Sequence, residues 1–230
     1  PNQLFDRSQV LDQLRPPAHA PEFSRVFAAR TCMMAGVGLT GVFLWYLVRF
    51  WVYGKAVVLT SAPLTIPAGF LIAGMAVATL IGAALASWAA GPISERIEEK
   101  NIPVARVVAG ACLLYAAGLA LAWGLGVWST GTARENGMLL FALISGFAFG
   151  VYDSLGLELV MDSLPDPRRA GHDLGIYALA NSAGLALAAI IGALLVNAFE
   201  HSFGYYLLFP SAIVMVLLAG IVTLTTKSAE

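Results

Sequence analysis

The chain has 230 residues, of which 59% are hydrophobic and 12% charged, and its formal net charge at pH 7 is −1. Its mean hydropathy is +0.78. A soluble domain carries about 25% charged residues, so this composition excludes an ordinary soluble domain. We therefore expect an all-α, polytopic membrane protein with the lipid bilayer as its solvent and no nucleic-acid partner.

Residues 1–29 are polar and interrupted by three prolines. Leu4, Leu11 and Leu14 could form one apolar face of a short amphipathic helix on the membrane surface. A flexible cytoplasmic linker explains the same residues equally well. Both alternatives stay open for this segment.

Six long apolar stretches follow the linker, and a membrane-spanning helix needs roughly 20 such residues. The expected spans cover about residues 31–48, 65–90, 104–128, 137–164, 174–198 and 203–226. Together they predict a six-helix transmembrane bundle over residues 30–226, followed by a short cytoplasmic tail at 227–230.

The basic residues predict the orientation of the bundle. With the N-terminus inside, the inner segments hold Arg7, Arg15, Arg25, Arg30, Arg96, Lys100, Arg106, Arg168, Arg169 and Lys227. The outer segments hold Arg49, Lys55 and Arg134. Because cytoplasmic segments of membrane proteins are enriched in Lys and Arg, we expect both termini to be cytoplasmic.

Small residues recur at intervals of four along three of the spans. The rows are Gly82–Ala86–Ala90, Gly146–Gly150–Ser154 and Gly184–Ala188–Gly192. Such rows let helix backbones approach closely in lipid, so they predict a tightly packed bundle and identify no function.

The fourth span carries Asp153 at a depth where an ionised side chain costs about 2.5–3.5 kcal/mol. One hypothesis makes Asp153 a proton- or cation-coupling group or a substrate contact in a central cavity, with Tyr152 as a hydroxyl neighbour. The alternative is a protonated Asp153 that joins two helices by a hydrogen bond.

Two further acids of this span, Glu158 and Asp162, are separated by one helical turn and approach the inner surface. Arg168 and Arg169 follow them in the next loop. We interpret these four residues as charges of an inner gate or as anchors of the loop.

The loop after the second span reads GPISERIEEKNIPVAR, in which Gly91 precedes Glu95 by four residues and Lys100 follows Arg96 by four. An ordinary charged cytoplasmic turn would explain it. However, the pattern resembles the loop motif of the major facilitator superfamily, Gly-x-x-x-Asp-Arg-x-x-x-Arg/Lys, with Glu95 in place of Asp. That resemblance implies that the charges latch neighbouring helix ends.

A second segment, LPDPRRAGHDLGIYALAN at residues 164–181, is similar to bacterial facilitators related to sugar–cation symporters. Residues 21–23 and Arg30 also resemble the start of the seventh span in that group. There the residue matching Asn181 is often followed by Pro-Gln, whereas this chain has Ser182 and Ala183. The resemblance implies the C-terminal six-helix half of a transporter, with Asn181 in the cavity that faces the other half.

Three classes of function remain to be compared. The expected function is secondary active transport of a small solute across a bacterial inner membrane, coupled to a proton or cation, with an N-terminal half as partner. The alternative is a non-transporting scaffold or accessory subunit that contacts another membrane protein.

An enzyme is not expected, because the chain contains no second aspartate in a Gly-x-Gly-Asp context, no His-Glu-x-x-His and no Gly-x-Ser-x-Gly. Cys32 and Cys112 lie inside apolar stretches, while His19, His172 and His201 lie outside the spans. We therefore expect neither a metal site nor a cofactor.

Overall fold

The computed structural model describes residues 21–53, 65–128, 132–164, 170–199 and 201–226, and all regular structure in these ranges is helical. The two alternatives for the first 20 residues, the tail at 227–230, and the loop residues Arg168 and Arg169 lie outside the described residues.

Among the described residues, five helices are long and apolar enough to cross a membrane. They are α4 (Thr65–Glu99), α5 (Val104–Trp128), α6 (Thr132–Asp162), α7 (Ala170–Ala198) and α8 (His201–Leu224). The third predicted span has both bounds of α5, and the other four predictions fall on the remaining helices with shifted ends. A polytopic, all-α membrane protein is therefore confirmed.

The first predicted span is not one continuous α-helix. It is divided into α2 (Pro21–Gly41), the short α3 (Leu44–Leu47) and the π-helix η1 (Val48–Val52). Helix α2 begins before residue 30, so residues 21–29 belong to the bundle and the predicted linker boundary at 29 needs correction. Pro21 at the first helical position and Glu22 in the first turn favour this earlier start.

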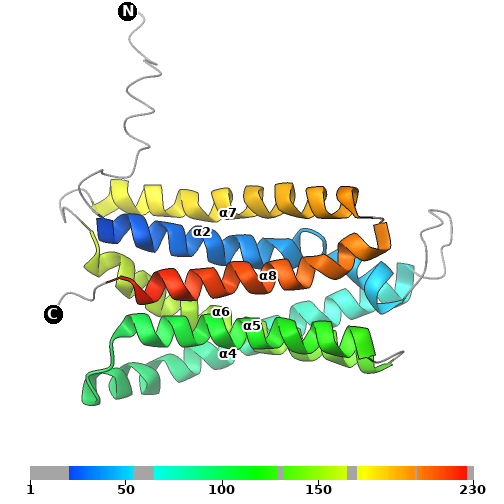
Figure 1. The fold of residues 1–230 in the computed structure, drawn as a ribbon. Helices are drawn as coiled ribbons and strands as arrows, with labels where there is room; N and C mark the ends of the chain where they lie inside the picture. Colours follow the sequence, from blue (N-terminus) through cyan, green and yellow to red (C-terminus); the bar gives the residue numbers. More distant parts are fainter. Residues whose placement is uncertain (1–20, 54–64, 129–131, 165–169, 200, 227–230) are drawn as a thin grey trace, which may run out of the picture.

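These three elements together run the length of the bundle beside α7 and α8 (Figure 1). At one end, Nη1 of Arg25 in α2 donates a hydrogen bond to the Thr225 carbonyl just after α8, over 3.1 Å. The start of the first segment and the end of the last helix therefore lie at the same end of the bundle.

Helix α4 continues past the predicted end at Ala90, through Pro92, as far as Glu99. Its end is closed by Asn101, which has a φ of 49°, and by a hydrogen bond of 3.0 Å from the Ile102 N–H to the Ile97 carbonyl. Asparagine tolerates this left-handed conformation better than most residues. Gly91, Glu95 and Arg96, expected in a turn, therefore lie on the last turns of a helix.

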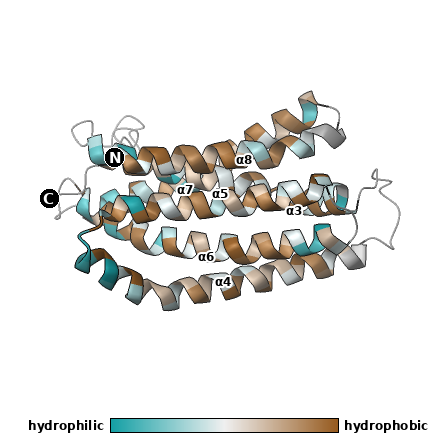
Figure 2. Ribbon diagram, turned by 60° about the horizontal axis from the view of Figure 1, so that its bottom comes forward, coloured by the Kyte–Doolittle hydropathy of each residue, from teal (hydrophilic) through white to brown (hydrophobic). Residues whose placement is uncertain are grey.

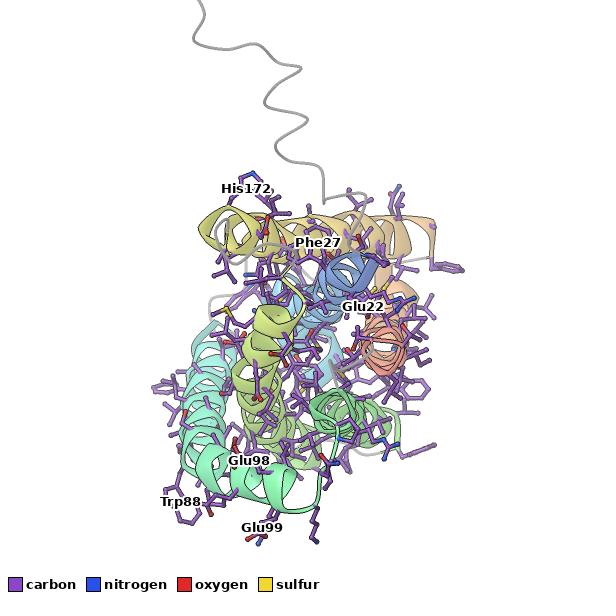
Figure 3. All side chains as sticks on the ribbon, turned by 90° about the vertical axis from the view of Figure 1, so that its left-hand side faces the viewer. Glu22, Phe27, Trp88, Glu98, Glu99 and His172 are labelled. Carbon is purple, nitrogen blue, oxygen red and sulfur yellow. The ribbon has the colours of Figure 1, made fainter. Side chains whose placement is uncertain are left out.

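The helices form two packed groups (Figure 1). Helices α4 and α5 pack against α6, whereas α7 and α8 pack against α2, and contacts between α5 and α8 join the groups. Viewed from one end of the bundle, His172 of α7 and Glu99 of α4 lie at opposite edges (Figure 3). Helices α2 and α6, one from each group, face each other near the middle.

The predicted rows of small residues meet across helix pairs. A Cβ atom on Gly146 of α6 would collide with the Thr79 carbonyl of α4, and one on Gly82 of α4 would collide with the Leu143 carbonyl of α6. A Cβ atom on Gly184 of α7 would lie 2.7 Å from the Thr31 carbonyl of α2. Close backbone approach along these rows is therefore confirmed.

The outward faces of the bundle are apolar. Along α4, Phe70 is 76% exposed and Trp88 80% exposed, and Figure 3 shows Trp88 pointing away from the other helices. Figure 2 shows that the hydrophilic residues of α4 gather at the end that carries Glu95 to Glu99. Lipid or another membrane protein must cover the apolar faces, because it is unfavourable to expose so much apolar surface to water.

Candidate functional site

The centre of the candidate site is an ion pair between the two helix groups. Nη1 of Arg30 in α2 lies 2.7 Å from Oδ1 of Asp153 in α6. The Arg30 side chain is 9% exposed, whereas the Asp153 side chain is 55% exposed. The cation is therefore enclosed by protein, and the carboxylate is open on one side.

A third helix contributes to the same arginine. Nε of Arg30 donates a hydrogen bond of 2.7 Å to Oδ1 of Asn181 in α7. A guanidinium presents several N–H donors in a fixed planar arrangement, so one side chain can bind both partners at once. Arg30 thereby connects α2, α6 and α7.

Three aromatic rings surround the remaining faces of the guanidinium. Its central carbon lies 5.6 Å from the ring centroids of Phe149 and Tyr152 and 5.7 Å from that of Tyr177. The rings of Phe149 and Tyr152 stack on each other with their centroids 6.3 Å apart. Ring faces attract a cation, which helps to offset the loss of water around Arg30.

The ion pair lies far from both ends of its helices. Arg30 is nine residues after the first residue of α2, Pro21, and Asp153 is nine residues before the last residue of α6, Asp162. At 1.5 Å rise per residue, each lies about 14 Å from that helix end. Both residues therefore lie about two and a half helical turns inside their helices.

Asp153 opens onto a cavity of about 390 Å³ between α2, α4, α5 and α6. The cavity is lined by Val37, Thr79, Ala83, Ser87, Tyr115, Ser145, Gly146, Phe149, Gly150, Asp153 and Ser154. Asp153 is the one charged member of this set, and five others carry hydroxyl groups. The volume is typical of a site for one small molecule, for which about 300–1,000 Å³ is usual.

The structure brings together the three residues expected at a cavity, but in different roles. Asp153 lines the cavity. Tyr152 is 3% exposed and contacts Arg30 with its ring, so it does not offer a hydroxyl group to the cavity as expected. Asn181 holds Arg30 and is not among the residues that line the cavity.

The other predicted residues lie away from this centre. Glu158 and Asp162 are exposed near the end of α6, and their expected partners are outside the described residues. Within the described ranges, no ion pair forms on Glu95, Arg96 or Lys100. The predicted latch and the predicted inner gate, which includes residues outside the described ranges, therefore stay predictions.

The sequence analysis did not predict that Arg30 is the residue that connects α2, α6 and α7. Arg30 was read as a marker of the end of a span, although an arginine followed by an apolar stretch can equally lie within the membrane. Tyr177 and Asn181 are one helical turn apart, as are Phe149 and Tyr152. These i, i+3 and i, i+4 pairs share a helix face, so they were a signal for a common partner.

Metal binding receives no support from the described part of the chain, where no three His, Cys, Asp or Glu side chains gather into a possible ligand set. The centre instead offers a carboxylate, hydroxyl groups and aromatic rings next to a small cavity. These groups can bind a polar solute or a proton.

Comparison with known proteins identifies the family. The family model of the Major Facilitator Superfamily matches residues 67–230, which is more than half of the chain and includes helices α5, α6, α7 and α8 in full. No curated protein and no solved structure matches the chain. The five helices able to span a membrane agree with such a protein. The chain therefore belongs to the major facilitator superfamily, a family of membrane transporters.

Proposed function

We propose that the chain is the C-terminal half of a secondary active transporter that moves a small solute by alternating access, coupled to a proton or another cation. The observation that carries this proposal is Asp153. Its carboxylate lies nine residues from the end of the membrane-spanning helix α6, is 55% exposed and lines the cavity, and is paired with a buried arginine. Ionisable residues at this depth are costly, and their presence is a reason to expect a functional site.

The position of the pair supports a role in coupling. Arg30 belongs to the group of α2, α7 and α8, and Asp153 to the group of α4, α5 and α6. While Asp153 is ionised, the pair holds α2 and α6 together. Binding of a proton to the open side of the carboxylate would weaken that attraction, so protonation and the relative movement of the two groups would be linked.

The proposed topology has six spans and cytoplasmic termini. The hydrogen bond between Arg25 and Thr225 supports it, because α2 then starts at the end of the bundle where α8 finishes. The apolar outward faces of the bundle fit lipid on one side and an N-terminal six-helix half on the other. A bacterial inner membrane and the latching role of Glu95 and Arg96 also belong to this proposal.

A two-stage experiment tests the proposed function. The complete protein, purified in detergent, is first screened for thermal stabilisation by sugars, polyols, amines and organic acids. Each stabilising solute is then offered to proteoliposomes that contain a trapped pH indicator, with parallel runs under a sodium gradient. Uphill uptake that an ionophore abolishes is the expected result, and uptake that ignores every ion gradient would contradict coupling.

A further inference from the structure

Four of the five hydroxyl groups that line the cavity donate their protons to a carbonyl of their own helix, at distances of 2.9 to 3.1 Å. The bonds run from Thr79 to Met75, from Ser87 to Ala83, from Ser145 to Ala142 and from Ser154 to Gly150. A hydroxyl that donates in this way still has lone pairs, so it meets a solute as an acceptor.

The remaining polar groups of the lining point to the same conclusion. The fifth hydroxyl group belongs to Tyr115, which is 4% exposed, and the neighbouring Thr40 donates its own proton to the Val37 carbonyl over 3.1 Å. Backbone N–H groups of the lining residues lie within helices and are used by the helices themselves. The carboxylate of Asp153 accepts hydrogen bonds and donates none when it is ionised.

The nearby cation is not available to the cavity. Arg30 does not line it, is 9% exposed, and is bound to Asp153, to Asn181 and to three aromatic rings. The charge that a solute meets is therefore the open side of Asp153. A negatively charged solute would find neither a free donor nor a free cation among the described lining residues.

We propose that this cavity selects solutes that present N–H or O–H donors and carry no negative charge, with a protonated amine as the best-matched group. Carboxylates and phosphates are rejected. The inference rests on the proposed transport function for its biological meaning, but its physical content is the sign of the potential and the excess of acceptors inside the cavity. Both can be measured without knowing the solute.

Thiol modification by charged reagents measures that potential. In a complete protein with Cys32→Ser and Cys112→Ala, one thiol is introduced by Ser154→Cys, beside Asp153. Its rates of reaction with trimethylammonioethyl methanethiosulfonate and with sulfonatoethyl methanethiosulfonate are compared. The ratio of the two rates removes the influence of the thiol's own pKa, because both reagents attack the same thiolate.

A matched site provides the reference. Thr132→Cys places a thiol at the exposed start of α6, outside the cavity, and its rate ratio normalises that of Ser154→Cys. We expect a normalised preference for the cationic reagent of about tenfold, the lower end of the range for charge focusing in clefts. Adding Asp153→Asn should remove most of this preference.

Three results would overturn the inference: a normalised ratio near or below one, a preference that Asp153→Asn leaves unchanged, or a Ser154→Cys thiol that neither reagent reaches. None of them depends on transport. A protein that shows the preference but transports nothing would retain the inference about the cavity and contradict the proposed function, so the two failures are distinguishable.

Discussion

Arg30 and Asp153 lie 2.7 Å apart, yet the arginine side chain is 9% exposed and the aspartate side chain 55%. The cation of the pair is therefore surrounded by protein, whereas the carboxylate is largely exposed to solvent. A buried cation must stay paired, because leaving it alone in a medium of low dielectric constant is expensive. The carboxylate can exchange this partner for water, a proton or a solute, which makes it the variable member of the pair.

Replacing Arg30 should affect transport more than stability. In Arg30→Gln the buried charge disappears together with its desolvation cost, and Asp153 is open enough to be hydrated. The removed desolvation cost offsets part of the lost contacts of Arg30 with Asn181 and the three rings, so the variant should remain folded although less stable than the parent. Coupled uptake in proteoliposomes should be lost, because Asp153 no longer has the cation that its protonation would release.

Two variants control this experiment. Arg30→Lys keeps the charge but cannot bind Asp153 and Asn181 in the same planar arrangement, so partial uptake is expected. Arg106→Gln removes an exposed arginine near the start of α5 and should leave uptake unchanged. Full coupled uptake by Arg30→Gln would show that the pair is structural.

The ring of Tyr177 should matter more than its hydroxyl group. Its centroid lies 5.7 Å from the guanidinium of Arg30, and Tyr177→Phe preserves this ring face. Tyr177→Leu removes it, which should cost about 0.5–2 kcal/mol in a desolvated site. Thermal unfolding in detergent should therefore show a clear loss for the leucine variant and a smaller one for phenylalanine. Equal losses would mean that the hydroxyl group carries the interaction.

Close contact between α4 and α6 predicts a sharp difference between two glycines. Gly146→Ala would place a methyl group against the Thr79 carbonyl, and the helices would have to move apart. Overpacking of this kind costs about 1–3 kcal/mol. Gly110→Ala is the control, because its Cβ atom would meet nothing within 4 Å. There alanine should be neutral or stabilise the helix by up to about 1 kcal/mol.

Thermal unfolding in detergent measures both glycine variants. If Gly146→Ala were as stable as Gly110→Ala, α4 and α6 could not be in backbone contact along this row.

Six spans and five spans make different predictions about sidedness. With six, single thiols introduced by Ser24→Cys and Thr225→Cys react with an impermeant maleimide from the same side of the membrane, and Thr132→Cys reacts from the opposite side. The background is the protein with Cys32→Ser and Cys112→Ala. Labelling of Ser24→Cys and Thr225→Cys from opposite sides would mean that the segment from α2 to η1 does not cross.

The apolar stretches predicted the helices because length and hydropathy are local properties. Both bounds of α5 follow from the sequence, since Arg106 is the one charged residue between Val104 and Trp128. The end of α4 could not be predicted in this way. The apolar stretch stops near Ala90, but the following residues include good helix formers, and the actual end depends on the conformation of Asn101.

The candidate site was predicted only in part, because its geometry depends on contacts between distant segments. In the sequence, Asp153 was a candidate only because it lies deep within the fourth predicted span. Its pairing with Arg30 joins residues on α2 and α6, and the bond from Arg30 to Asn181 joins α2 and α7. No periodicity within one helix specifies which residue of another helix it will face. The same limit explains why Tyr152 was assigned to the cavity when its ring instead contacts Arg30.

Asp153→Asn in the complete protein tests the central claim most directly. The substitution keeps the shape of the side chain and removes its charge and its ability to take up a proton. The matched control is Glu98→Gln, which neutralises an exposed acid at the end of α4 (Figure 3). Coupled uptake in proteoliposomes should be abolished by Asp153→Asn and retained by Glu98→Gln. Glu98→Gln should be as stable as the parent to within about 1 kcal/mol. Asp153→Asn should be less stable, because it leaves the buried Arg30 without its carboxylate, so its folded state is checked by thermal unfolding in detergent before uptake is compared. Unchanged coupled uptake by Asp153→Asn would contradict the account and leave Asp153 as a structural partner of Arg30.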